Sequence, residues 1–124
     1  MFYGGDGNDI IRGMGGANII TGGKGNDSML GGSGEDTFII NLGDGQDTVN
    51  GGGYDDTLLF GPGITWDSIA FTREDFDAKL TLPGGGSVVI ESAFSPYATV
   101  DFLKFADGTT KTWEDVKSEI LNEA

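Results

Sequence analysis

The chain has 124 residues, of which 23 are glycine, and a formal net charge of −13 at pH 7. This length suits one domain, and so large a negative charge excludes nucleic acid as a partner and requires either bound cations or an expanded chain. The sequence contains no cysteine and no histidine, which excludes disulfides, thiolate or imidazole metal sites, and Ser-His-Asp catalysis. Oxygen ligands for hard metal ions are abundant.

The first half of the chain is a repeat of nine residues, of which GGDGNDIIR is the first copy. The six units start at Gly4, Gly13, Gly22, Gly31, Leu42 and Gly51. Two extra residues, Ile40 and Asn41, separate the fourth unit from the fifth, and we expect them to widen the coil without changing which side chains point inward. A glycine-rich hexad ending in an acid, followed by three residues with an apolar centre, predicts a parallel β-roll.

The sixth and eighth positions of the units carry this pattern. The sixth positions are Asp9, Asn18, Asp27, Asp36, Asp47 and Asp56. The eighth positions are Ile11, Ile20, Met29, Phe38, Val49 and Leu58. We expect the eighth positions to point into the core, because side chains alternate along a strand. Since two units complete one coil, the sixth positions should form two columns, with Asp9, Asp27 and Asp47 in one and Asn18, Asp36 and Asp56 in the other.

Acids in adjacent coils would lie about 4.8 Å apart and repel each other without a cation between them. Calcium suits these gaps, because it takes six to eight oxygens at about 2.3–2.6 Å from carboxylates and backbone carbonyls, whereas magnesium requires a tighter octahedron. The columns predict up to four calcium ions, between Asp9/Asp27, Asp27/Asp47, Asn18/Asp36 and Asp36/Asp56. Glycines at positions one, two and four allow positive φ and close approach of neighbouring turns, so that carbonyls can converge on each ion.

Three substitutions weaken the pattern locally. Asn18 is neutral and Met14 replaces a glycine, so the gap between Asn18 and Asp36 should be the weakest site or empty. Tyr54 stands in the place of a glycine and weakens the prediction for the last gap.

From Gly61 onward the sequence favours ordinary strands and one helix. We expect a helical turn at residues 65–69, capped by Thr65, and strands at 68–72, 78–82, 87–90 and 100–105, with a hairpin at 83–86. A C-terminal helix should begin after Thr112, with Asp115 in a capping box. Its apolar stripe is Trp113, Val116, Ile120 and Leu121.

These elements predict an all-β fold with a parallel β-roll over residues 1–60. Residues 61–124 form a β-rich cap that ends in a short α-helix and makes one cooperative unit with the roll, because solenoid ends need caps. Leu30, Ile39 and Leu59 occupy outward positions, and we expect the cap to cover the outer face of the sheet that contains Ile39 and Leu59. The sequence predicts neither a transmembrane segment nor a cleaved signal peptide.

The repeats and the segments LLFGPGITWDSIAFTR, LTLPGGGSVVI and VDFLKFADGTT resemble the RTX (repeats-in-toxin, haemolysin-type calcium-binding) family. The similarity is to the last repeat block and C-terminal flanking cap of adenylate-cyclase haemolysins and related exported proteins. It implies a right-handed roll whose calcium ligands are the six sixth-position side chains and the carbonyls of Gly5, Gly7, Gly23, Gly25, Gly32, Gly34, Gly43 and Gly45. It also implies a secreted protein that leaves the cell through a type I secretion apparatus and folds outside on binding calcium. We expect a monomer without catalytic residues.

Other classes of protein fit the sequence less well. A flexible linker would not keep acids and apolar residues in register six times, and no EF-hand loop occurs. A polysaccharide-binding module requires a groove of basic and aromatic residues; with only seven Lys and Arg, an acidic glycan is disfavoured while a neutral one stays open. A hydrolase using Asp75 with Asp77, or Asp55 with Asp56, ranks last, because most acids belong to turns.

Overall fold

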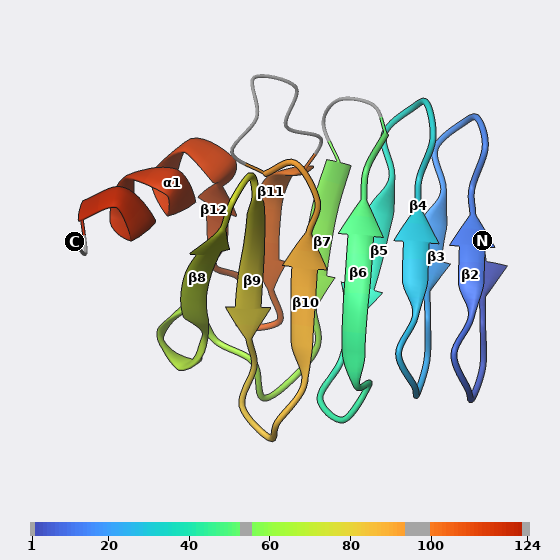
Figure 1. Cartoon of the computed structure of the whole chain (residues 1–124), viewed down its shortest axis with the longest axis horizontal. Helices are drawn as coiled ribbons and strands as arrows, with labels where there is room; N and C mark the ends of the chain where they lie inside the picture. Colours follow the sequence, from blue (N-terminus) through green and yellow to red (C-terminus); the bar gives the residue numbers. More distant parts are fainter. Residues whose placement is uncertain (1, 53–55, 94–99, 123–124) are drawn as a thin grey trace.

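The computed structural model describes residues 2–52, 56–93 and 100–122, and the side chains of these except residues 119–122. They form two six-stranded sheets that face each other along the molecule (Figure 1). Sheet A consists, in spatial order, of β1 (Phe2–Tyr3), β3 (Ile19–Thr21), β5 (Thr37–Ile40), β7 (Asp56–Phe60), β11 (Val100–Phe105) and β12 (Thr110–Thr112). Sheet B consists of β2 (Ile10–Arg12), β4 (Ser28–Leu30), β6 (Gln46–Asn50), β10 (Ser87–Ile90), β9 (Asp77–Thr81) and β8 (Ala70–Glu74).

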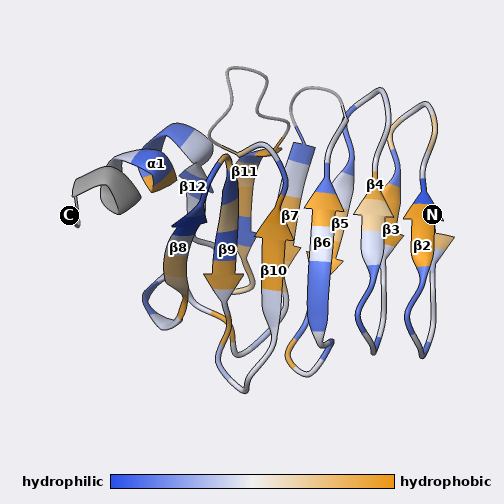
Figure 2. Ribbon diagram, in the orientation of Figure 1, coloured by the Kyte–Doolittle hydropathy of each residue, from blue (hydrophilic) through white to orange (hydrophobic). Residues whose placement is uncertain are grey.

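The strands from β1 to β7 form the predicted parallel β-roll. Successive units alternate between the sheets, so that Ile11 pairs with Met29 in sheet B and Ile20 pairs with Phe38 in sheet A. All six eighth-position side chains are buried, as the alternation along a strand requires. The strands carry the hydrophobic residues, whereas the turns at the lower end of the roll are mostly pale or blue (Figure 2). The all-β class and the six-unit register are therefore confirmed.

The two-residue insertion lengthens the coil and leaves its faces unchanged. Ile40 becomes the last residue of β5, is 1% exposed, and pairs with Phe60 at the end of β7. An extra inward-facing pair is thereby added to the core where the roll meets the cap. The even step explains why the eighth positions after the insertion, Val49 and Leu58, still point inward.

The cap continues both sheets edge to edge. Strand β11 pairs in parallel with β7, and β10 pairs in parallel with β6; β9 and β8 then follow β10 in antiparallel order. Contrary to the prediction, the described strands of the cap extend sheet A at its edge instead of covering its outer face, where Ile39 and Leu59 are half-buried. The physical reason is that the edge strands of the roll carry rows of unpaired N–H and C=O groups. Leaving these groups without partners costs more free energy than leaving two outward apolar side chains half-exposed.

Element bounds in the cap follow the sequence closely, with two exceptions. The helical turn is a 3-10 helix at Trp66–Ser68, where the Ser68 hydroxyl accepts the Thr65 N–H at 2.9 Å, so β8 begins only at Ala70. Strand β12 was not predicted, because its Thr-Lys-Thr sequence has no apolar alternation.

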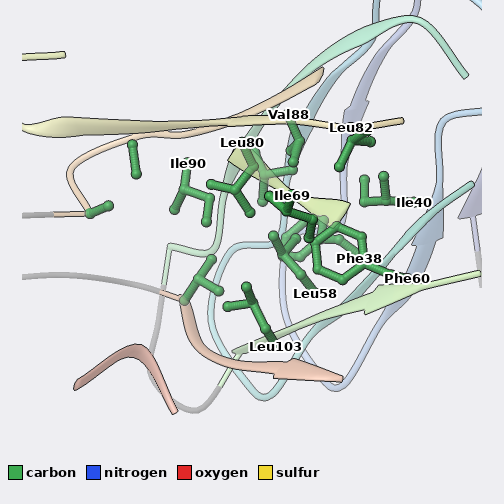
Figure 3. Packing of buried hydrophobic residues seen from close by; sticks show 14 of the residues in the cluster. Phe38, Ile40, Leu58, Phe60, Ile69, Leu80, Leu82, Val88, Ile90 and Leu103 are labelled. Carbon is green, nitrogen blue, oxygen red and sulfur yellow. The ribbon is translucent and has the colours of Figure 1, made fainter. Parts of the chain in front are cut away.

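One hydrophobic core runs through the roll and the cap (Figure 3). Helix α1 (Trp113–Asn122) packs against β8, β11 and β12 at the end of the molecule. Trp113 is 3% exposed and donates its indole N–H to the Ala93 carbonyl at 2.6 Å, and Val116 is fully buried. The Thr112 hydroxyl accepts the Asp115 N–H at 3.2 Å, which is the expected cap. The side chains of Ile120 and Leu121 lie outside the described residues.

Candidate metal centre

The turns of the roll bring the sixth-position side chains into the two expected columns. In the first column, Oδ1 of Asp27 accepts the Asp9 N–H and Oδ1 of Asp47 accepts the Asp27 N–H, both at 2.9 Å. In the second column, Oδ1 of Asp36 accepts the Asn18 N–H at 2.9 Å, and Oδ1 of Asp56 accepts the Asp36 N–H at 2.6 Å. Four acids thus each fix the coil before them through one carboxylate oxygen, namely Asp27, Asp36, Asp47 and Asp56.

The second carboxylate oxygen of these acids is buried without a hydrogen-bond donor. This holds for Oδ2 of Asp9, Asp27 and Asp36 within the described part of the chain. Asp27 is 2% exposed and Asp36 is 1% exposed, so both carboxylates are shielded from bulk solvent. A buried carboxylate oxygen is costly unless a cation or donor compensates it.

Burial also raises the proton affinity of the column carboxylates. It raises the pKa of Asp27 and Asp36, and it raises the pKa of Asp47 to about 7, with the Asp27 carboxylate adding to the effect on Asp47. Without a cation, these carboxylates therefore hold protons more tightly than usual. A divalent ion between them would favour the ionised form.

Glycines of the turns serve two different purposes. Those at positions two and four have positive φ, as at Gly23 (85°) and Gly25 (111°). Gly22, at position one, does not have positive φ and instead permits a close approach. Gly22 is required there for space, because a Cβ on it would lie 2.5 Å from Oδ2 of Asp27.

Backbone carbonyls complete an oxygen-only donor set. A Cβ on Gly23 would lie 2.5 Å from the Gly5 oxygen, and one on Gly45 would lie 2.5 Å from the Gly25 oxygen, so these carbonyls point toward the next turn of their column. No donor to the carbonyls of Gly5 or Gly25 occurs among the described residues. Three acidic side chains do not converge on one point anywhere in the described ranges, so carbonyls would have to supply much of any coordination shell. This set fits calcium.

The remaining carbonyls of the expected ligand set differ in their surroundings. The Gly7 oxygen faces Gly25, and the Gly32 oxygen lies near Gly52. The Gly16 oxygen, which was not among the expected ligands, faces Gly34. A Cβ added to Gly43 would meet no atom within 4 Å, which is consistent with the wider coil after the insertion. The carbonyl of Gly45 accepts the Ser87 N–H from the cap at 3.0 Å, so it belongs to the junction with β10.

Sequence reasoning missed an amide ladder beside the first column. Oδ1 of Asn8 accepts the Asn26 N–H at 2.7 Å, and Oδ1 of Asn26 accepts the Gln46 N–H at 2.9 Å. All three residues occupy the fifth position of their units, and the shared carboxamide was the signal that could have revealed the ladder. It ties the turns together independently of any ion.

The other carboxylate pairs do not form a second site. Asp75 is exposed in the β8–β9 hairpin, whereas Asp77 accepts the Ser92 N–H at 2.8 Å. Asp56 is buried in its column, and Asp55 lies outside the described residues.

A hollow of about 540 Å³ lies on the outer face of sheet A. It is lined by Glu35, Thr57, Phe102, Lys104 and Thr110. The hydroxyl of Thr57 comes from a strand of the roll. The ring of Phe102, the ammonium group of Lys104 and the hydroxyl of Thr110 come from strands of the cap.

The model of the RTX calcium-binding nonapeptide repeat matches residues 3–38 and 39–63 in four copies. The roll belongs to the RTX calcium-binding repeat family. No curated protein matches the chain. The RTX chain is similar in fold to the extracellular lipase LipA from Serratia marcescens, with a TM-score of 0.53 and 21% identity over 77% of this chain. The match covers 14% of the length of the lipase chain. No helix among the described residues is long and apolar enough to cross a membrane.

Proposed function

We propose that this chain is a non-catalytic module whose folding depends on calcium, and which ends the RTX roll of a protein secreted by a bacterial type I apparatus. The observation that carries the proposal is the set of buried Oδ2 oxygens, at Asp9, Asp27 and Asp36, that no described donor satisfies. Calcium would be held by the sixth-position carboxylates and by turn carbonyls such as those of Gly5 and Gly25. The ion supplies positive charge and a flexible coordination shell.

The energetics support conditional folding. A ligand that binds only the folded state stabilises it by RT ln(1 + [L]/Kd), which is about 2.7 kcal/mol at a hundredfold excess over Kd. Several such sites would contribute about as much as the total stability of a small domain, which is roughly 5–15 kcal/mol. Extracellular calcium modules have Kd values of about 10⁻⁴–10⁻³ M, so the chain would stay unfolded in a cytosol and fold outside the cell.

A calcium titration tests this function directly. The full chain is placed in chelator, calcium is added stepwise, and far-ultraviolet circular dichroism and tryptophan fluorescence are recorded. We expect a disordered spectrum in chelator and strand formation with burial of Trp113 on adding calcium. A chain already folded in chelator would contradict the proposal.

A second candidate function is the binding of a neutral saccharide, favoured by the hollow on sheet A. Phe102 offers a ring face and Thr57 and Thr110 offer hydroxyls, which is chemistry suited to a sugar. A panel of neutral glycans tested on the calcium-loaded chain and on Phe102→Ala would decide it. Binding that Phe102→Ala abolishes would support this candidate, and no binding by the unmodified chain would dismiss it.

A further inference from the structure

The turn at residues 13–18 differs from its neighbours in the group at its centre. A Cβ on Gly13 would lie 2.6 Å from Nδ2 of Asn18, just as one on Gly4 would lie 2.6 Å from Oδ2 of Asp9. The Asn18 amide nitrogen thus occupies the place that a carboxylate oxygen occupies in the Asp turns. Asn18 is 9% exposed, so solvent has little access to it.

The amide nitrogen satisfies the carbonyls that surround it. Nδ2 of Asn18 donates to the carbonyl oxygens of Gly13 at 3.1 Å, Gly15 at 3.3 Å and Gly16 at 3.2 Å. An amide oxygen in that place would face three carbonyl oxygens, so only the nitrogen fits there. The remaining carbonyl of the turn, that of Met14, accepts the Ser33 N–H at 2.9 Å. All four carbonyls of residues 13–16 therefore have protein donors.

The Asp turns show the opposite pattern. Oδ2 of Asp9 is buried without a described donor, and the carbonyls of Gly5 and Gly7 in the same turn accept no hydrogen bond from any described residue. Oxygens gathered in this way repel one another until a cation lies between them. A partially positive NH₂ group removes that repulsion without an ion.

We propose that the Asn18 amide takes the place of a calcium ion, so that the turn at residues 13–18 closes without metal and the gap between Asn18 and Asp36 stays empty in the calcium-loaded protein. This inference rests on the proposed calcium function and adds which gap is excluded and by which group. The roll then binds one ion fewer than its number of gaps.

Asn18→Asp tests the inference by restoring the carboxylate present in the other five units. The full chain is dialysed against calcium, and bound calcium per chain is counted by elemental analysis. We expect Asn18→Asp to bind one ion more than the unmodified chain. The matched control is Asn50→Asp, which makes the same chemical change on strand β6 outside the turns and should leave the ion count unchanged.

The outcomes separate the two proposals. If the unmodified chain binds calcium but Asn18→Asp binds no more, the Asn18 inference is overturned while the calcium function stands. If the unmodified chain binds no calcium, the proposed function itself fails.

A crystal structure of the calcium-loaded, unmodified chain tests the same point without a variant that could fail to fold. Anomalous difference density for calcium is expected in other gaps and absent between Asn18 and Asp36. A calcium peak in that gap would overturn the inference.

Discussion

At the scale of single residues, the acids of a column are not equivalent. Asp27 accepts a hydrogen bond from Asp9 and donates one to Asp47, so it contacts the coils on both sides. Asp9 lies in the first coil of this chain, and among the described residues its column neighbour is Asp27 alone. An interior acid therefore borders two candidate ion gaps, and a terminal acid borders one.

This asymmetry predicts different calcium requirements for two alanine variants. Asp27→Ala should raise the calcium midpoint of folding more than Asp9→Ala, because it removes a ligand from two gaps, each worth about 2.7 kcal/mol at a hundredfold excess of calcium. Calcium titrations followed by circular dichroism give both midpoints. Equal shifts would refute the column arrangement of ions.

Two glycines at the same position of their units form a second matched pair. Gly23 and Gly43 have φ of 85° and 80°, but a Cβ on Gly23 would lie 2.5 Å from the Gly5 oxygen, whereas one on Gly43 would meet nothing within 4 Å. Gly43→Ala should cost only the left-handed conformation, about 1–2 kcal/mol. Gly23→Ala should cost more and raise the calcium midpoint, because it displaces an expected ligand. Chemical denaturation in saturating calcium measures the difference, and equal costs would contradict it.

At the scale of elements, the helix closes the end of the sandwich that the sheets leave open. Trp113 and Val116 of α1 enter the same core as the roll. In the same core, the rings of Phe60 in β7 and Phe105 in β11 stack at 5.0 Å between centroids. Roll and cap therefore share side-chain packing as well as backbone pairing.

Truncating Trp113 should consequently destabilise the roll, although this residue belongs to the cap. Trp113→Ala removes a buried ring and the hydrogen bond to Ala93, which should cost about 3–5 kcal/mol and raise the calcium midpoint of the whole chain. Phe76→Ala, at a ring that is 63% exposed, is the control and should change stability by less than about 0.5 kcal/mol. A Trp113→Ala chain with an unchanged midpoint would show that the helix is not part of the folding unit.

The sequence could predict the roll and not the way in which the cap joins it. The nine-residue period determines strand, turn and inward face at once, so Ile11, Phe38 and the others were placed correctly. Ile39 and Leu59 suggested a covering layer, since pattern reasoning cannot tell an outward apolar residue at a sheet junction from one beneath a cap. The contacts of Asn18 could not be predicted from the repeat pattern either. The pattern shows that a charge is missing at this position, but it does not show that the amide donates to three carbonyls.

At the scale of the whole molecule, the negative charge and the shared core predict one cooperative folding transition. Magnesium screens charge as calcium does but prefers a small octahedral shell, so it should not fold the chain at the same concentration. With calcium, the circular dichroism signal, which includes the roll, and the tryptophan fluorescence, which reports the cap, should change with the same midpoint. Separate midpoints would indicate that roll and cap fold independently.

The edge-to-edge junction also bears on how long such a roll can be. Strands β10 and β11 pair in parallel with β6 and β7, as a further coil would. The cap thus contacts the edge of the last coil and is indifferent to how many coils come before it. Asp9 and Asp27 in adjacent coils are 18 residues apart, whereas Asp27 and Asp47, which span the insertion, are 20 apart. We expect that 18-residue segments can be added or removed upstream of β6 without altering the junction. Roll length is therefore a variable that sequence duplication can change one coil at a time, and the cap needs no change to accommodate it.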